Sequence, residues 1–409
     1  MKRFFRNCRI IDGTGGVIEK GWLLIEDNLI SGVGSMEQVP GHVGTETSAE
    51  GTEDMSGKTI LPGLIDCHVH LALDGSPDPM SKIAGMTDPL ATLHMAKHGE
   101  ATLRGGVTTV RDLGSKNFID LQVRDAVNSG LVKGPRMLCA GQMICITGGH
   151  GWQVGCEADG PDEVRRAARK QIKAGVDCVK FMATGGVLTK GGRPGVPQLQ
   201  LEELKAGIEE AHKVSLRTAA HSQGPEGSKN AVLAGIDSIE HGVALSEETI
   251  EEMVKRNVFL VPTFSAPVNI MAKGEEAGIP KEFVEKTKRV EDEHIRSVFR
   301  AKKAGVKIAM GTDAGTPFNQ HGENPSELVY MTDFGFSAEE ALLSATSTAA
   351  ELLGLEGRIG TIAVGKLADL LIVEGNPLED IRVLTDPGRI VAVFKEGLKA
   401  SDTNITQRR

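Results

Sequence analysis

Short apolar runs separated by Gly, Asp and Asn turns occur near both ends of the chain, a pattern that predicts β-strands. The polar stretch 41–57 has little to bury and predicts a loop. We therefore predict one small β-sandwich lobe that both ends build together, from residues 1–58 and 355–409. Its predicted strands lie at 8–11, 21–25, 29–33, 365–373 and 389–394.

Between these ends the sequence repeats a different module. It consists of an amphipathic helix, then Ala-Gly, then a β-branched residue that begins an apolar strand. This module occurs at 174–176, 234–236 and 304–306. Glycine suits the left-handed residue that ends a helix, so each module predicts a helix end followed at once by a strand. Pro161 and Gly175 frame the clearest of these helices, because proline favours the first helical position.

Eight apolar segments alternate with helical ones between residues 59 and 354. Several are almost entirely apolar or small, as parallel strands buried on both faces should be. We assign the chain to the α/β class and predict a (β/α)8, TIM-like barrel over 59–354. An open doubly wound sheet is the alternative, but no Gly-x-Gly-x-x-Gly turn follows any strand. The predicted strands lie near 60–67, 107–112, 136–142, 177–182, 216–221, 236–241, 258–263 and 306–312.

The composition is an ordinary globular one, with 40% hydrophobic and 25% charged residues among 409. A net charge of -9 argues against nucleic acid or an anionic membrane surface as a partner. The sequence has no apolar run of membrane-spanning length and no signal-peptide pattern, so we expect a cytoplasmic protein. The six cysteines lack Cys-x-x-Cys spacing, and we expect reduced thiols.

The first predicted barrel strand ends in a pair of histidines, His68 and His70. Side chains two residues apart on a strand point to the same face, so these two imidazoles project together. Two neighbouring imidazoles are a natural pair of metal ligands, although a His-x-His pair is a weak signal by itself.

Further chemically active side chains occur at other predicted strand ends, where a TIM barrel gathers its chemistry. Each of these residues could instead have a purely structural role. A lone histidine at a strand end is usually hydrogen-bonded, and Asp313 suits a helix N-cap. Lys180 is harder to explain, because an unpaired ammonium in an apolar strand costs several kcal/mol. Taken jointly, the set fits poorly with independent structural roles. Its members are His150, Lys180, His221, His241 and Asp313.

This constellation closely resembles the amidohydrolase superfamily over essentially the whole chain. The run Pro62-Gly63-Leu64-Ile65-Asp66-x-His68-x-His70 carries the resemblance together with the later strand-end residues. It implies a binuclear centre with two divalent metal ions, usually zinc. Lys180 would be carboxylated by CO2 and bridge both ions, which turns a buried cation into an oxygen-donor anion. The implied ligands are His68, His70 and Asp313 for one ion, and His221 and His241 for the other.

General metal chemistry then gives a mechanism. Two metal ions lower the pKa of a bridging water towards hydroxide at neutral pH. Asp313 can accept the proton of this water on attack and pass it to the leaving amine. His150 is our candidate donor to the developing oxyanion, because its Gly-Gly-His-Gly setting permits close approach of substrate.

The segments 148–151, 238–242 and 311–315 are similar to the group that contains prolidases, Xaa-Arg/Lys dipeptidases and imidazolonepropionase. Within this group, Lys180 favours the binuclear, peptidase-like branch. One departure concerns the substrate. Peptidase members often have His-Ala-Tyr at the fifth strand, with the tyrosine near the substrate carboxylate, whereas this chain has Gln223.

Four residues are candidates for substrate contacts: Gln223, Lys190, Arg193 and His321. Lys190 and Arg193 lie in the long loop after the fourth strand and could bind a substrate carboxylate. A solvated loop charge is an equally good reading for both. His321 follows Asp313 on the next strand-end loop, where residues at a barrel mouth often contact substrate.

We predict a metal-dependent amidohydrolase that cleaves the amide C–N bond of a small-molecule substrate, a dipeptide or an N-acyl amino acid. One alternative is a hydrolase of a non-peptide amide, carbamate or cyclic amide, as imidazolonepropionase is. Another is a non-catalytic binding protein on the same fold, which has no physical need for a complete ligand set. The sequence carries no clear interface signal, and whether the chain forms a homo-oligomer stays open.

Overall fold

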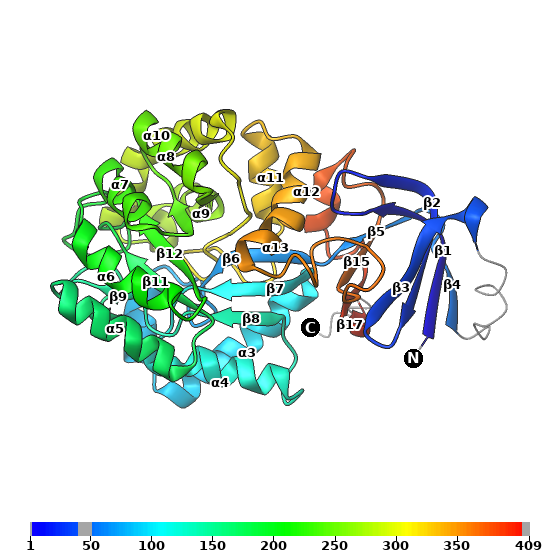
Figure 1. The fold of residues 1–409 in the computed structure, drawn as a ribbon, viewed down its shortest axis with the longest axis horizontal. Coiled ribbons are helices and arrows are strands. Elements are labelled where there is room, and N and C mark those ends of the chain that lie inside the picture. The colour runs from blue at the N-terminus through cyan, green and yellow to red at the C-terminus, as the bar shows by residue number, and fades with distance from the viewer. Residues whose placement is uncertain (1, 40–50, 403–409) are drawn as a thin grey trace.

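The computed structural model describes residues 2–39 and 51–402, in which a sheet of terminal strands lies beside a larger α/β part (Figure 1). The terminal sheet has the strand order β17-β16-β15-β5-β1-β2-β3, with β4 paired to β1. Part of the predicted loop, 41–50, lies outside the described residues. The strands are β1 Lys2–Ile11, β2 Val17–Glu26, β3 Leu29–Ser35, β4 Thr52–Asp54, β5 Lys58–Pro62, β15 Leu370–Glu374, β16 Ile390–Lys395 and β17 Leu398–Asp402.

Both ends of the chain contribute strands to this sheet, as the pattern of short apolar runs predicts. Strand β15 pairs antiparallel with β5, and β5 pairs parallel with β1. Phe5, Leu23 and Phe394 are fully buried in its core. The folding of this sheet into two sandwich layers stays a prediction, as do the domain boundaries at residues 58 and 355.

The other strands form two parallel sheets, β6-β7-β8 and β10-β9-β11-β12-β13-β14. The predicted first strand, 60–67, is divided at Gly63 between β5 and β6. A Cβ on Gly63 would lie 2.3 Å from the side chain of Thr108, so only glycine fits this junction. The strands are β6 Leu64–Val69, β7 Val107–Asp112, β8 Arg136–Cys139, β9 Ile144–Cys145, β10 Cys156–Glu157, β11 Cys178–Met182, β12 Arg217–Ser222, β13 Ser238–His241 and β14 Phe259–Val261.

The predicted eighth strand, 306–312, is wrong as a regular strand. Ile308 makes only an isolated parallel bridge to Leu260 of β14. The amide of Ala309 donates to the Leu260 carbonyl, but that of Met310 donates to Ser344 instead. A ladder needs successive bonds to one partner strand, and here the bonds are divided among neighbours. The segment still lies between β14 and β6, because Cys67 N–H donates to the Met310 carbonyl.

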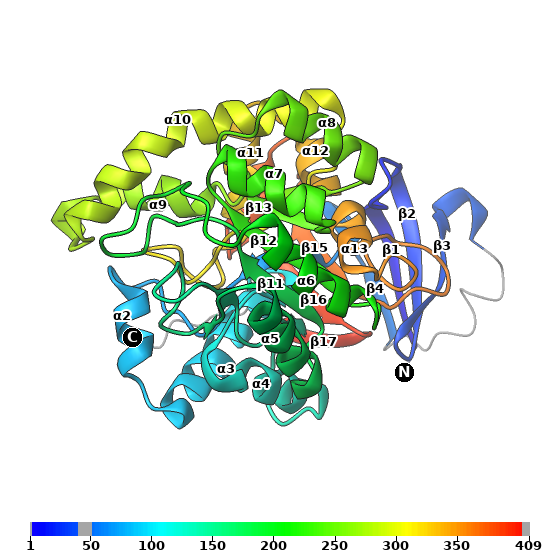
Figure 2. The same cartoon turned by 60° about the vertical axis from the view of Figure 1, so that its left-hand side comes forward.

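Helices cover the parallel strands on the outside (Figure 2). As predicted, α5 begins at Pro161 and ends before Gly175, whose φ is 90°. Gly235 and Gly305 end α7 and α10 in the same way. None of the helices within 2–39 and 51–402 is both long and apolar enough to cross a membrane. The helices are α2 Pro79–Gly85, α3 Asp88–Arg104, α4 Ile119–Asn128, α5 Pro161–Ala174, α6 Leu201–His212, α7 Pro225–Ala234, α8 Glu247–Arg256, α9 Ser265–Lys273, α10 Lys281–Ala304, α11 Ser326–Asp333, α12 Ala338–Ser344 and α13 Ser347–Leu353, with 3₁₀ turns at Met36–Gln38, Lys116–Phe118, Glu275–Ala277 and Ile381–Thr385.

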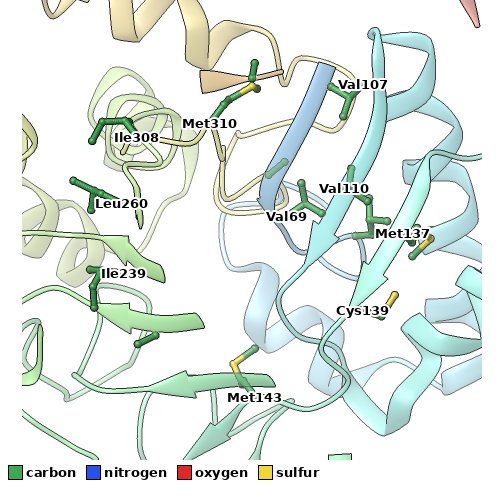
Figure 3. Close-up of a cluster of buried hydrophobic side chains, with 14 of the residues drawn as sticks. Val69, Val107, Val110, Met137, Cys139, Met143, Ile239, Leu260, Ile308 and Met310 are labelled. Atoms are coloured by element: carbon green, nitrogen blue, oxygen red, sulfur yellow. The ribbon is translucent and has the colours of Figure 1, made fainter. Parts of the chain in front are cut away.

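The core of the α/β part lies among the parallel strands and against the helices. Figure 3 shows side chains from separate strands in this core, including Val69, Val110, Ile239 and Leu260. Complete burial of such a side chain stabilises the fold by about 1.5–3 kcal/mol. The six cysteines are free thiols, as predicted. This packing fixes the strand ends, where the predicted site residues lie.

Candidate metal centre

The six predicted metal ligands come together around one cavity of about 520 Å³. Four of them are almost completely buried, with exposed fractions between 1% and 4%. The four histidines come from the C-terminal parts of parallel strands or directly follow one, Lys180 lies at the middle of β11, and Asp313 follows the irregular segment 306–312. The six are His68 on β6, His70 after it, Lys180 on β11, His221 on β12, His241 at the end of β13, and Asp313 in the segment after Val306.

The first group is His68, His70 and Asp313, whose ligand atoms all lie within 4.8 Å of one another. The Nε2 atoms of His68 and His70 are 3.4 and 3.5 Å from Asp313 Oδ1. His68 Nδ1 bonds to Glu240 at 2.8 Å, and His70 Nδ1 bonds to the Gly114 carbonyl at 3.1 Å. Because Nδ1 must be the donor in both bonds, each ring presents its Nε2 lone pair towards Asp313.

The second group is His221 and His241, whose Nδ1 and Nε2 atoms lie 2.9 Å apart. His241 Nδ1 lies 2.7 Å from the Thr263 hydroxyl, which donates its own proton to the Pro262 carbonyl. The hydroxyl must therefore accept from His241 Nδ1–H, and His241 Nε2 carries a lone pair. His221 Nε2 is buried without a hydrogen-bond partner in the described chain.

Lys180 is the most unusual member of the site. Its side chain is 1% exposed, and its Nζ has no hydrogen-bond partner among the described residues. Burial lowers the pKa of Lys180 to about 8, against the opposing effect of Glu240 and Asp313. Burial also raises the pKa of Asp313 to about 7, against the effect of Lys180. Orphaned atoms on Lys180 and His221, beside the Nε2 lone pairs of His68 and His70, fit a site for divalent cations.

A buried network that sequence reasoning missed holds His68. Glu240 accepts from His68 through one oxygen and from Arg111 Nη2 at 2.9 Å through the other. Arg111, with no exposed surface, also donates to the Cys67 carbonyl and to Ser238. The sequence does indicate that these two residues are unusual, because Arg111 and Glu240 are charged residues inside apolar strands, as Lys180 is.

A second network ties Asp313 to the first strand. Asp66 accepts from the backbone amides of His68 and Thr312, and also from the Thr312 hydroxyl and Asn324. Desolvation raises the pKa of the buried Asp66 carboxyl to about 6. Asp313 itself has a φ of 58°, a conformation that L-residues adopt only when surrounding contacts impose it. The contacts of Asp66 therefore help to position both His68 and Asp313.

His150 lies beside the metal centre on the loop after β9. Its ring centroid is 4.2 Å from that of His221, and its Nδ1 is 2.6 Å from the Thr189 hydroxyl. Burial lowers the pKa of His150 to about 3, so the ring is neutral at physiological pH. Gly186 packs on this ring so closely that a Cβ there would lie 2.5 Å from it. The ring is thus held at the cavity wall.

The four candidates for substrate contact are placed differently. Gln223 lines a second cavity of about 510 Å³, which also contains His150, His221, His241 and Asp313. Lys190 is exposed and pairs with Asp78 at 2.8 Å. His321 bonds to the Leu73 carbonyl and stacks on His98 with centroids 4.6 Å apart. Lys190, Arg193 and His321 are absent from the described lining of both cavities.

The sequence pattern of the amidohydrolase family matches residues 59–399, so the chain belongs to this family. The ochratoxinase of Aspergillus niger is 32% identical to it, covering 95% of this chain and 84% of the relative. The imidazolonepropionase of Maricaulis maris is 27% identical, covering 88% of this chain and 89% of the relative.

Solved structures agree with this assignment. A Xaa-Pro dipeptidase with bound methionine in its active site matches with a TM-score of 0.88 at 34% identity, covering 98% of this chain and 99% of that one. A prolidase complexed with N-methylphosphonate-L-proline matches with a TM-score of 0.88 at 30% identity, with the same coverage. These neighbours imply a TIM-barrel fold. The chain is a hydrolase of amide carbon–nitrogen bonds in the imidazolonepropionase- and prolidase-like group, as predicted.

Proposed function

We propose that this chain is a binuclear metal hydrolase on a closed (β/α)8 barrel, and that it cleaves the amide bond of a dipeptide or N-acyl amino acid. His68, His70 and Asp313 would hold one divalent ion, and His221 and His241 the other. Zinc suits this donor set. The observation that carries the proposal is the buried cluster of lone pairs around the orphaned Lys180 amine.

Lys180 is proposed to be carboxylated and to bridge the two ions. Its neutral amine forms an N–C bond to CO2, one C=O bond opens to a carboxylate, and one proton leaves to water. Burial favours the neutral amine that this reaction needs, because it lowers the pKa of Lys180. The product replaces an unpartnered buried nitrogen donor with two oxygen ligands.

When bound, the two ions would activate a water and polarise the amide carbonyl. Asp313 would accept a proton from the attacking water through its carboxylate and deliver it to the leaving amine nitrogen. His150 would donate to the oxygen that gains negative charge. For that role its ring needs Nε2–H, with Nδ1 accepting from the Thr189 hydroxyl at 2.6 Å.

The family supports an amide substrate, and the named activities of the relatives narrow the class. The dipeptidase and prolidase matches favour a dipeptide or N-acyl amino acid over a cyclic amide. The imidazolonepropionase is less similar in sequence than the ochratoxinase. A complete set of predicted ligands around one cavity argues against a non-catalytic binding protein.

The test combines metal analysis with a substrate screen. Protein purified without chelator is expected to hold about two equivalents of divalent metal, and dipeptides, N-acyl amino acids and cyclic amides are screened for released amine. Lys180→Ala is expected to lose metal and activity, whereas Lys255→Ala, at an exposed helical lysine, retains both. Less than one equivalent of metal in the wild type, or full activity of Lys180→Ala, would refute the proposal.

A further inference from the structure

Glu327, on α11, is a fully buried acidic residue that the proposed reaction does not use. Its Oε1 accepts from the backbone amide of Phe264 at 2.7 Å, and its Oε2 accepts from the amide and the hydroxyl of Ser265 at 2.6 Å each. All three partners donate, so both oxygens act as acceptors, as in an ionised carboxylate. Burial raises the pKa of Glu327, and the three donors oppose this rise. These three bonds, the Glu327 clamp, hold the turn between β14 and α9.

The residue before this clamp, Thr263, has a backbone conformation that is rare for its type. Its φ is 55°, and a β-branched residue takes such a value only when its surroundings impose it. The next residue is Phe264, whose amide the clamp holds and whose ring packs on Phe334, just after α11, with centroids 5.0 Å apart. Thr263 is fully buried and lines the second cavity with His241. The clamp therefore fixes the backbone that presents the Thr263 hydroxyl to this site.

The Thr263 hydroxyl fixes the direction of two successive hydrogen bonds. It donates to the Pro262 carbonyl and therefore accepts from His241 Nδ1–H, both at 2.7 Å. Burial lowers the pKa of His221 and of His241 well below the ordinary value, so each ring is neutral and carries one N–H. With its proton on Nδ1, His241 accepts at Nε2 from His221 Nδ1 at 2.9 Å. The lone pair of His221 is then on Nε2, which has no hydrogen-bond partner anywhere in the described ranges.

We propose that Glu327 is a positioning residue that sets the tautomers of His241 and His221 by acting through Thr263. The clamp holds Thr263 in its unfavourable conformation, Thr263 keeps the proton of His241 on Nδ1, and His221 Nε2 is left as a ligand atom. Without the clamp, the hydrogen bond between the two imidazoles can run in either direction, because each ring can donate or accept. This inference rests on the proposed binuclear centre, in which these two histidines hold the second ion.

The competing explanation is that Glu327 only joins α11 to α9. A purely structural role predicts a less stable protein that loses both metal ions together or neither, with the histidine tautomers unchanged. A positioning role predicts a selective change, in which the ion at His68, His70 and Asp313 is retained and the second ion is weakened. Loss of an outer partner of a ligating histidine typically lowers metal affinity about 10–100-fold, and we expect an effect of this size for the second ion alone.

Glu327→Gln is the main variant, because it keeps the size of the side chain and replaces one acceptor oxygen with an NH2 group that cannot accept from an amide. Purified without chelator, it is expected to hold about one equivalent of divalent metal instead of about two. Thr263→Val removes the hydroxyl directly and is expected to give the same result. Glu323→Gln, at an exposed position before α11, is the matched control and should bind metal as the wild type does.

A second measurement needs no metal. Two-bond proton–nitrogen correlation spectra of the chelator-treated full chain, with ¹⁵N-labelled histidine, report which nitrogen of each imidazole carries the proton. The His241 signals are assigned by their absence in His241→Gln. The wild type is expected to show Nδ1–H alone for His241, and Glu327→Gln a mixture of both tautomers. If the wild type binds no metal, the proposed function fails and this measurement decides the inference by itself.

A His241 tautomer that Glu327→Gln leaves unchanged would overturn the inference, as would a mixture already present in the wild type. Wild-type affinity for the second ion in this variant, or equal loss of both ions, would overturn it as well. If circular dichroism shows that Glu327→Gln does not fold, Glu327→Asp decides instead. Its shorter carboxylate withdraws from Phe264 and should give part of the same change in tautomer, whereas wild-type tautomers would overturn the inference. Failure of both variants to fold would show a role in the whole fold and overturn the selective one.

Discussion

The two ends of the parallel strands differ in how their polar groups are satisfied. Toward the C-terminal ends, Lys180 Nζ and His221 Nε2 are buried with no hydrogen-bond partner within residues 2–39 and 51–402. At the N-terminal end of β13, Asp237 accepts from His212, Arg217 and Thr218 at 2.8–2.9 Å. The polar groups at the start of β13 are thus hydrogen-bonded within the protein. The nitrogen atoms toward the other end of the strands are left for metal ions or substrate to bind.

This contrast assigns stability to one end of the strands and chemistry to the other. The chain repeats one module at two strands, Ala-Gly-Val-Asp-Cys-Val-Lys and Ala-Gly-Ile-Asp-Ser-Ile-Glu, ending in Lys180 and Glu240. In both copies the aspartate, Asp177 or Asp237, is hydrogen-bonded at the strand start. The charged residue three positions later is buried near the metal centre, so a single module supplies both functions.

The largest expected effect is at the chemical end. Asp313→Asn keeps the size of the side chain but removes the carboxylate that accepts the proton, so kcat should fall by about 10²–10⁴-fold. In metal-free protein, thermal unfolding should not move to lower temperature, because the buried carboxylate carries a desolvation cost. Asp292→Asn, at an exposed position on α10, is the matched control. A kcat within three-fold of wild type would remove Asp313 from the reaction.

The next largest effect is expected for Glu240→Gln, which disturbs the network behind His68. Loss of an outer partner of a ligating histidine typically lowers metal affinity about 10–100-fold. Unpairing the buried Arg111 should also lower the free energy of unfolding by about 3–5 kcal/mol. Metal titration and urea denaturation measure the two effects, with the exposed Glu226→Gln as control. Unaltered metal affinity would show that Glu240 has only a structural role.

Asp237→Ala tests whether the hydrogen bonds at the N-terminal end of β13 stabilise the fold. It should lower the free energy of unfolding by about 1–3 kcal/mol and leave metal content intact. Hydrogen bonds from His212, Arg217 and Thr218 outweigh burial and hold the pKa of Asp237 at about 2, below its ordinary 3.8. A depressed pKa stabilises the fold above the unfolded-state value and loses this contribution as pH falls from about 4 to about 2. The variant should therefore show a flatter stability profile in that window, measured by denaturation at each pH. A decline as steep as that of wild type would contradict the assignment.

The smallest effect is expected on the loop that sequence analysis connected with substrate. Lys190 pairs with Asp78 outside both cavities, and exposed pairs of this kind contribute about 0–1 kcal/mol. Lys190→Ala should therefore leave kcat/KM within about two-fold of wild type for substrates with a carboxylate. A KM raised ten-fold for these substrates, but not for uncharged amides, would restore Lys190 as a substrate ligand.

Much of the fold and of the candidate site could be predicted because the signals are local. The modules ending in Gly175, Gly235 and Gly305 predict helix ends correctly, since the left-handed glycine is dictated within a few residues. The division at Gly63 and the irregular segment 306–312 were missed. Their hydrogen bonds go to distant partners such as Asp369 and Ser344, which periodicity cannot identify.

The sequence by itself determined the residue types at the strand ends, because parallel strands place their C-terminal residues at one edge whatever the loops do. Only the tertiary structure decided which of these atoms are left unpartnered. It also decided that Glu240 and Arg111 lie behind His68, and that His294, from a helix far along the chain, faces the second cavity. Contacts such as Lys190 with Asp78 join residues 112 positions apart, and such pairings depend on packing rather than on local pattern.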